Sequence, residues 1–194
     1  MSYATSRGAI RLVSYFGVAF SGALLLAGCG NAEDDESASF ETSFMQEMTD
    51  HHAMAVDMGE ICIDSATHEE LRTTCQGIVT SQTAEIAQFQ SWLSEWYDVA
   101  DYQPQMSDDD HQQMQALESL EGEEFEIEFM DMMIEHHQQA VTDAQECTSR
   151  ATHEALLSIC EDIIEAQTAE IAQMETWLCD WYSMCDGARQ VYRR

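Results

Sequence analysis

Methionines and histidines with helical spacing occur twice in this chain. In the first copy Met45 and Met48 precede a His51-His52 pair, and the arrangement returns at His136, 136 − 51 = 85 residues later. Residues three and four apart share one face of a helix, so thioethers and imidazoles can converge. Thioether sulfur prefers Cu(I), and by the same softness Ag(I), while imidazole accepts several metals. The predicted ligands of a copper or silver ion are Met45, Met48, His51, His52, Met130, Met133, His136 and His137.

Methionine has a second, non-chemical use, because its flexible side chain commonly fills space in a protein core. Met45 and Met48 could therefore be packing residues only, and this alternative stays open at the level of the sequence. Other methionines could add peripheral metal sites. They are Met54, Met58, Met132 and Met174.

The repeat extends far beyond the histidine pair. The same shift of 85 residues aligns Cys62 with Cys147, Cys75 with Cys160 and Trp96 with Trp181, without a gap. This is internal duplication, and two copies are too few for a solenoid. We expect each copy to be a helical hairpin, and the two hairpins to close into one all-α, ferritin-like four-helix bundle with a short connector helix.

The apolar spacing and the capping residues place the helices that position these groups. Four long helices are expected over residues 40–64, 68–97, 123–149 and 153–184. Thr67 and Glu70 resemble a capping box at the start of the second helix. Ser107 resembles the N-cap of the connector helix, and Gly187 is expected to end the last helix. The expected bundle (40–186) consists of hairpin one (40–97), the connector (98–122) and hairpin two (123–186). A tail (187–194) follows it.

The N-terminus resembles a targeting segment rather than part of the fold. Arg7 and Arg11 give it a positive start, and an apolar run follows that is short for a membrane-spanning helix. Residues 26–29, Leu-Ala-Gly-Cys, resemble the lipobox of bacterial lipoproteins, in which the cysteine is lipidated. We therefore expect a signal peptide over 1–28 and lipidation of Cys29; an ordinary secretory signal and an uncleaved membrane helix are the alternatives.

The residues after the lipobox predict where the protein is held. In bacterial lipoproteins, an aspartate directly after the lipidated cysteine resembles a signal for retention at the inner membrane. Here that position is Gly30, which favours the outer membrane. Residues 29–39 are acidic and read as a tether between the lipid and the domain. The expectation is an exported, lipid-anchored protein of the cell envelope that faces the periplasm.

Export makes the remaining six cysteines interpretable, because disulfides form in oxidising compartments. Six cysteines allow about 15 pairings, but the duplication favours the pair that each copy repeats, Cys62 with Cys75 and Cys147 with Cys160. Cys179 and Cys185 then pair by elimination. The alternative is a thiolate metal site, which would need reduced cysteines at closer, paired spacing.

The charge of the chain limits its partners. The formal net charge is −30, and all 7 basic residues are arginines. Binding nucleic acid or an anionic lipid surface requires a basic patch, which is absent, so cations are the favoured partners. A solvated acidic surface suited to a saline habitat would explain the charge equally well.

Two polar segments interrupt the buried stripes of the second and fourth helices. Gln82 and Glu85, like Gln167 and Glu170, are spaced by three and lie on or beside the apolar face. A buried glutamate is costly unless it is paired, and the nearest expected partner is a histidine of the pair. The segment is either a structural polar network or a set of outer partners that orient metal-bound imidazoles.

Taken together, the motifs resemble a known family. The first motif consists of Phe44, Met48, the histidine pair and Ala55, and the second is a segment of the form Q-x-x-E-I-x-x-F-x-x-W-L-x-x-W. In these two motifs the chain resembles the bacterial domain of unknown function 305. The resemblance covers both halves, and it implies a ferritin-like bundle of two hairpins. Some members are secreted proteins that bind copper or silver through Met and His, which implies the same activity for the eight residues named above.

Other function classes fit the sequence less well. A di-iron oxidase on this fold needs inward Glu-x-x-His pairs, whereas Met48 and Met133 stand where those glutamates should be. No serine or reduced cysteine is placed with a base for nucleophilic catalysis. We therefore expect a binding protein rather than an enzyme. A structural or interaction lipoprotein without a metal is the main alternative.

Overall fold

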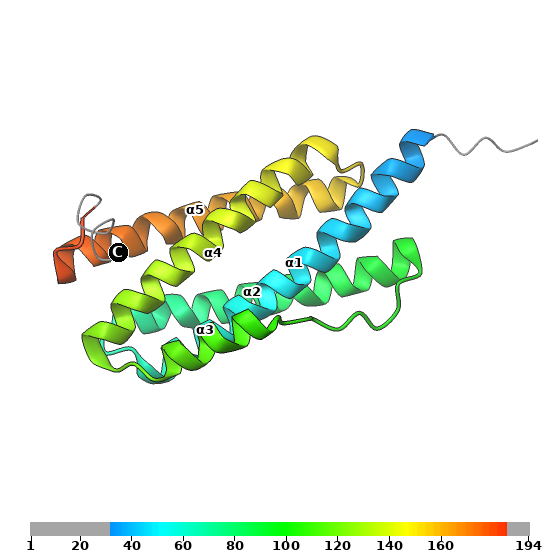
Figure 1. Ribbon diagram of the computed structural model, residues 1–194. Helices are drawn as coiled ribbons and strands as arrows, with labels where there is room; N and C mark the ends of the chain where they lie inside the picture. Colours follow the sequence, from blue (N-terminus) through cyan, green and yellow to red (C-terminus); the bar gives the residue numbers. More distant parts are fainter. Residues whose placement is uncertain (1–31, 186–194) are drawn as a thin grey trace, which may run out of the picture. The chain divides into compact units, whose positions relative to one another are not determined.

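The computed structural model describes residues 32–185, which form an all-α bundle (Figure 1). Within that range none of the helices has the length and apolar character needed to cross a membrane. The expected signal peptide (1–28), Cys29, Gly187 and the tail lie outside the described residues. The helices are α1 (Ala32–Ser65), α2 (Glu69–Tyr97), α3 (Asp108–Glu118), α4 (Gly122–Arg150) and α5 (Glu154–Tyr182).

Two hairpins build the fold, as the duplication predicted. Helix α1 packs along α2, and α4 packs along α5. The hairpins meet through their first helices, because α1 also contacts α4, and α3 packs on both of these helices (Figure 1). The sequence motif at the start of each copy, which carries the histidine pair, therefore lies on the two helices that face each other.

The core consists of two apolar clusters. One combines the turn of hairpin one with the open end of hairpin two, and includes Cys62, Leu71, Phe125 and Leu178. The other combines the open end of hairpin one with the turn of hairpin two, and includes Phe44. The turn of each hairpin thus lies beside the open end of the other hairpin. An approximate two-fold axis relates the equivalent parts of the two hairpins. The apolar residues that recur at helical spacing along α1 form one buried stripe, as such spacing predicts: Phe44, Met48, Ala55, Met58 and Cys62.

All three predicted disulfides are present. Cys62 is bonded to Cys75 and Cys147 to Cys160, with Cα–Cα distances of 6.2 and 6.3 Å, and each bridge joins the two helices of one hairpin beside its turn. Cys179 and Cys185 form the third. Six cysteines are consumed in this way, so the thiolate metal site is excluded.

Removing the Cys62–Cys75 bridge by alanine substitution should lower the free energy of unfolding by about 3 kcal/mol, because the unfolded chain regains the freedom of a closed loop of this size. The bridge spans 13 residues, as does Cys147–Cys160, whereas Cys179–Cys185 spans 6. Urea unfolding followed by circular dichroism measures the loss, and the second long bridge serves as a matched comparison. Equal stability of the variant and the parent would contradict an entropic role for the bridge.

The turn of each hairpin is held by a glutamate from the other hairpin. Glu126 of α4 accepts hydrogen bonds from the backbone N–H groups of Thr67 (2.6 Å) and His68 (2.8 Å), and its other oxygen lies 2.7 Å from His68 Nδ1. The Tyr182 hydroxyl donates to the same carboxylate. The expected Thr67–Glu70 capping box is wrong: His68 is the N-cap of α2 and has no side-chain cap bond. Glu126, a residue of the other hairpin, accepts from the backbone N–H groups of Thr67 and His68 at the start of α2, in place of a capping residue from the same segment.

The same arrangement occurs in the other copy. Glu41 of α1 accepts from Thr152 Oγ1 (3.0 Å), from His153 N (3.1 Å) and from the Tyr97 hydroxyl. The rings of His153 and Trp96 stack at 4.1 Å. We call these two groups, each centred on a fully buried glutamate, the glutamate clamps. Because each clamp joins α1 or α4 to the opposite hairpin, the clamps fix how the hairpins sit on each other.

The helix ends differ from the predictions in three places. Helix α1 begins at Ala32, so most of the segment 29–39, expected as a tether, is its first part. The Ser107 cap is confirmed, with its hydroxyl accepting from Asp110 N, but α3 ends at Glu118, before the end of the connector expected at residue 122. Helix α5 ends at Tyr182, where Ser183 adopts a left-handed conformation with φ 58° and stops the helix before residue 184.

Candidate metal site

The histidine pairs meet where α1 and α4 face each other. The rings of His51 and His136 lie 3.5 Å apart between centroids and are tilted by 32°. His51 Nε2 donates to the backbone carbonyl of His136 at 3.1 Å. Both side chains are only partly buried. The duplication has therefore placed equivalent imidazoles against each other on the approximate two-fold.

The second histidine of each pair turns into its own hairpin. His52 Nε2 lies 2.6 Å from Glu85 Oε2, and His137 Nε2 lies 2.8 Å from Glu170 Oε2. Both imidazoles are fully buried, whereas the glutamates are about one fifth exposed (20% and 24%). The contact expected between the polar segments and the histidines is thus present. The neighbouring carbonyl oxygens of Gln82 and Gln167 are buried without a hydrogen-bond partner among the described residues.

These contacts determine which ring nitrogen is left over. A carboxylate or a backbone carbonyl can only accept, so Nε2 carries the hydrogen in His51, His52 and His137. In the neutral ring Nδ1 then keeps a lone pair. The Nδ1 atoms of all four histidines, including His136, are buried and have no hydrogen-bond partner in the part of the chain that the structure covers. A buried polar atom without a partner is uncommon, and a lone pair on imidazole is a metal ligand.

The electrostatics keep the central pair uncharged. Burial, together with the nearby His52 and His137, lowers the pKa of His51 to about 3. Burial and the neighbouring His51 lower the pKa of His136 well below its ordinary 6.5. Both rings are therefore neutral at physiological pH, as metal binding requires.

The methionines fall into two groups. Met45 and Met48 are buried with Phe44 in one apolar cluster, and Met130 and Met133 are buried in the other. These four side chains pack in the core while lying on the same helices as the histidines. A second group lines the other side of the histidine pair, and one of its members, Met58, is also fully buried.

That side is a pocket of about 390 Å³ between α1, α4, α3 and the connector. His51 and His136 line it together with four methionines: Met54, Met58, Met106 and Met132. Three of the four were expected as peripheral ligands. Met106 was missed because it lies in the connector, outside the repeat. We call this the methionine pocket.

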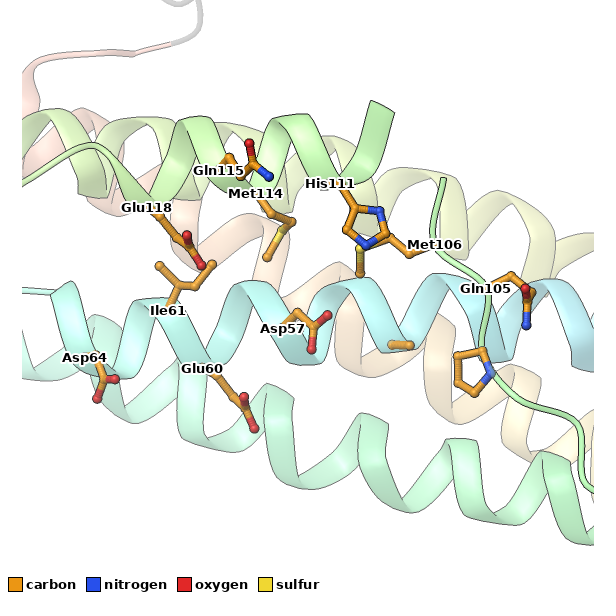
Figure 2. A pocket seen from close by; sticks show the side chains of 12 residues that line it. Asp57, Glu60, Ile61, Asp64, Gln105, Met106, His111, Met114, Gln115 and Glu118 are labelled. Carbon is orange, nitrogen blue, oxygen red and sulfur yellow. The ribbon is translucent and has the colours of Figure 1, made fainter. Parts of the chain in front are cut away.

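An acidic groove of about 700 Å³ lies beside it, between α1 and α3 (Figure 2). Figure 2 shows Asp57, Glu60 and Glu118 around it, with His111 and Met106 at one end. Burial and the nearby Glu60 raise the pKa of Asp57. Met106 also lines the methionine pocket, so the acidic groove leads toward the histidines and favours cations there.

The donor set of the described residues is consistent with a soft ion. Nowhere in residues 32–185 do three or more His, Cys, Asp or Glu side chains gather as a metal site would require. The additional donors that line the pocket beside His51 and His136 include four thioether sulfurs, which favour Cu(I) and Ag(I) over hard cations.

Comparison with known proteins identifies the family. The model of the domain of unknown function 305 (DUF305) matches residues 41–178, which includes both hairpins. The chain belongs to the DUF305 family. Its resemblance to this family, drawn from the histidine and tryptophan motifs, is confirmed.

Several solved structures share the fold. "CopM in the Cu(I)-bound form" is 32% identical, over 73% of this chain and 97% of that chain, with a TM-score of 0.66. "CopM in the Ag-bound form (by co-crystallization)" is 33% identical with the same coverage and a TM-score of 0.65. A putative secreted DUF305 protein from Streptomyces coelicolor is 27% identical over 74% of this chain and 93% of that chain, with a TM-score of 0.65. A search of curated proteins gives no significant match.

Proposed function

We propose that this DUF305 protein binds Cu(I) or Ag(I) through Met and His side chains at the centre of its bundle. It buffers the ion or hands it on, and does not turn over a substrate. The observation that carries the proposal is the set of four buried Nδ1 atoms without hydrogen-bond partners, next to a pocket lined with methionine. The CopM structures in copper-bound and silver-bound forms support it.

Different residues of the chain would bind the ion, orient its ligands and attract it to the site. Imidazole lone pairs and thioether sulfurs offer neutral donors, so a monovalent ion loses its hydration without burying several negative charges against it. Glu85 and Glu170 would orient His52 and His137 from outside, as carboxylates commonly do for metal-bound imidazoles. The acidic groove raises the local concentration of cations at the entrance.

The proposal includes the place where the protein works. With lipidation at Cys29 and a signal over 1–28, the bundle would be held at the outer membrane and face the periplasm. The disulfides agree with an oxidising compartment. The same compartment exposes a cell to metal ions from outside, which suits a protein that sequesters them.

The experiment is a Cu(I) titration of the chain against a chromophoric chelator, with the six bundle cysteines confirmed as oxidised. We expect stoichiometric binding that competes with a chelator of nanomolar affinity, equivalent to roughly 12 kcal/mol of binding free energy. Because the site relies on neutral donors, about 0.5 M sodium nitrate, whose anion does not compete for Cu(I), should leave the affinity nearly unchanged. Weak binding that salt abolishes would leave the acidic surface as the only binder and favour a structural lipoprotein.

A further inference from the structure

The two halves differ in their methionines, and three of the differences fall at one place. The four core methionines obey the repeat, since Met45 and Met48 correspond to Met130 and Met133. Met174, which pairs with Phe89 and is buried in the core, breaks it, and so do three others. The shift of 85 residues pairs Met54 with Gln139, Met58 with Asp143 and Met132 with Glu47.

All three of these methionines line the methionine pocket with His51 and His136. Gln139 lines it too, opposite Met54 across the approximate two-fold. Glu47 and Asp143 line a different pocket, of about 410 Å³, that contains Phe40 and Arg150 instead of a histidine. At Met58 and Met132, one side of the two-fold thus has sulfur where the other side has a carboxylate.

The connector adds a fourth thioether to the same side. Met106 has no counterpart in the repeat, and it reaches the pocket because the preceding residues are anchored on α1. The Tyr102 hydroxyl donates to both oxygens of Asp50 (3.0 and 2.9 Å), and Gln105 N donates to Asp50 Oδ1 at 2.8 Å. Asp50 precedes His51, so the anchor places Met106 next to the histidine pair.

We infer that the chain holds one soft monovalent ion in this one-sided pocket, with His51 or His136 and the thioethers of Met54, Met58, Met106 and Met132 as the donor set. The inference deepens the proposed function and rests on it. A site that followed the duplication would exist twice and would use the core methionines. Three of the methionines that break the repeat instead gather at a single place, where a second copy of the site would meet Glu47 and Asp143.

The carboxylates around the pocket suit this occupant. Asp50, Asp110 and Glu135 line its wall without forming a group of three that could hold a metal ion by themselves among the described residues. They offset the single positive charge of the ion at a distance. The sulfur and imidazole donors select for softness, so the pocket should discriminate against Zn²⁺ and Mg²⁺.

The test uses Ag(I) and the methionine methyl groups of the full chain. With methionine methyls labelled with ¹³C, one equivalent of Ag(I) should shift the signals of Met54, Met58, Met106 and Met132 and leave those of Met45, Met48, Met130 and Met133 in place. Native mass spectrometry should show one tightly held ion per chain. Shifts confined to the core methionines, or two ions held with equal affinity, would overturn the inference.

A pair of matched variants completes the test. Leucine keeps the volume of methionine and removes its sulfur. The triple variant Met54→Leu, Met58→Leu, Met132→Leu should weaken Ag(I) binding by more than about 100-fold, the upper end of what loss of an outer partner alone costs. The control Met45→Leu, Met48→Leu, Met133→Leu should bind like the parent. If the parent binds Ag(I) and the triple variant binds equally well, the inference fails alone; if the parent binds none, the proposed function fails with it.

Discussion

Alanine at both His51 and His136 is expected to abolish tight Cu(I) binding while the helices stay folded. The two rings stack on each other at the methionine pocket, and their Nδ1 atoms are buried without a partner. Removing both takes every imidazole out of the pocket. The affinity should fall by more than the roughly 10–100-fold that a lost outer partner costs, measured by chelator competition.

The two rings are suited to this test because their structural contribution is small. Both side chains are partly exposed, and His51 Nε2 donates its hydrogen bond to a backbone carbonyl at 3.1 Å. Far-ultraviolet circular dichroism should therefore show unchanged helix content. Extending the change to His52 and His137 should remove the remaining binding, at a higher cost in stability, because both of those rings are fully buried.

The matched control is His111→Ala. His111 is an exposed histidine of α3 that lines the acidic groove and not the methionine pocket. The His111→Ala variant should bind Cu(I) with the affinity of the parent. A quadruple histidine variant with parental affinity would move the site to the acidic surface or to the tail.

The parts of the fold that were predictable are those set by local spacing and by the duplication. Periodicity identified the buried stripe of α1, and the repeat singled out the pairing of Cys62 with Cys75 among many alternatives. The contact of Glu85 with the histidine pair followed from the cost of burying a carboxylate without a partner. In each case the determining residues lie within one hairpin, where helix geometry alone relates them.

The residues that sequence reasoning missed act between the hairpins. Glu41 and Glu126 looked like polar residues at the start of a helix, and their partners lie 111 and 59 residues away in the chain. A signal was available, because Phe-Glu and Ala-Thr-His-Glu occur in both copies, while much of the surface between them has diverged. Identity between the copies at a polar position marks Glu41 and Glu126 in the same way as it marks the histidines. Met106 carried no such signal, since only the anchored connector brings it to the site.

Glutamine at Glu41 or Glu126 is the substitution that should cost the most stability. Each carboxylate is fully buried and accepts from two backbone N–H groups and a tyrosine hydroxyl. Burial opposes its ionisation, but the hydrogen bond from Tyr97 and those from Thr152 and His153 outweigh it and lower the pKa of Glu41 to about 2. Burial likewise raises the pKa of Glu126, and the bonds from Tyr182, His68 and Thr67 lower it to about 2. Removing one buried charge from such a set costs about 3 kcal/mol or more.

The two clamps lie at opposite ends of α1, so the double variant should lose about the sum of the two costs. A domain is stable by roughly 5–15 kcal/mol, so the double variant would be close to unfolding at room temperature. Urea unfolding followed by circular dichroism compares the parent with both single variants and the double variant. Asp109→Asn, an exposed change in the first turn of α3, is the control and should unfold within about 0.5 kcal/mol of the parent.

The pH dependence separates a lost charge from a merely disturbed contact. The folded pKa of Glu41 is about 2 and its ordinary value is 4.5, so the stabilisation is complete above pH 4.5 and is lost as the pH falls toward 2. The partly buried His51, with its lowered pKa, also favours unfolding in acid, but it does so equally in the parent and in the variant. The difference in unfolding free energy between parent and Glu41→Gln should therefore be constant from pH 7 to 5 and shrink below pH 4.5. A difference that kept its full size at pH 2.5 would mean that the glutamate acts by shape and hydrogen-bond number rather than by its charge.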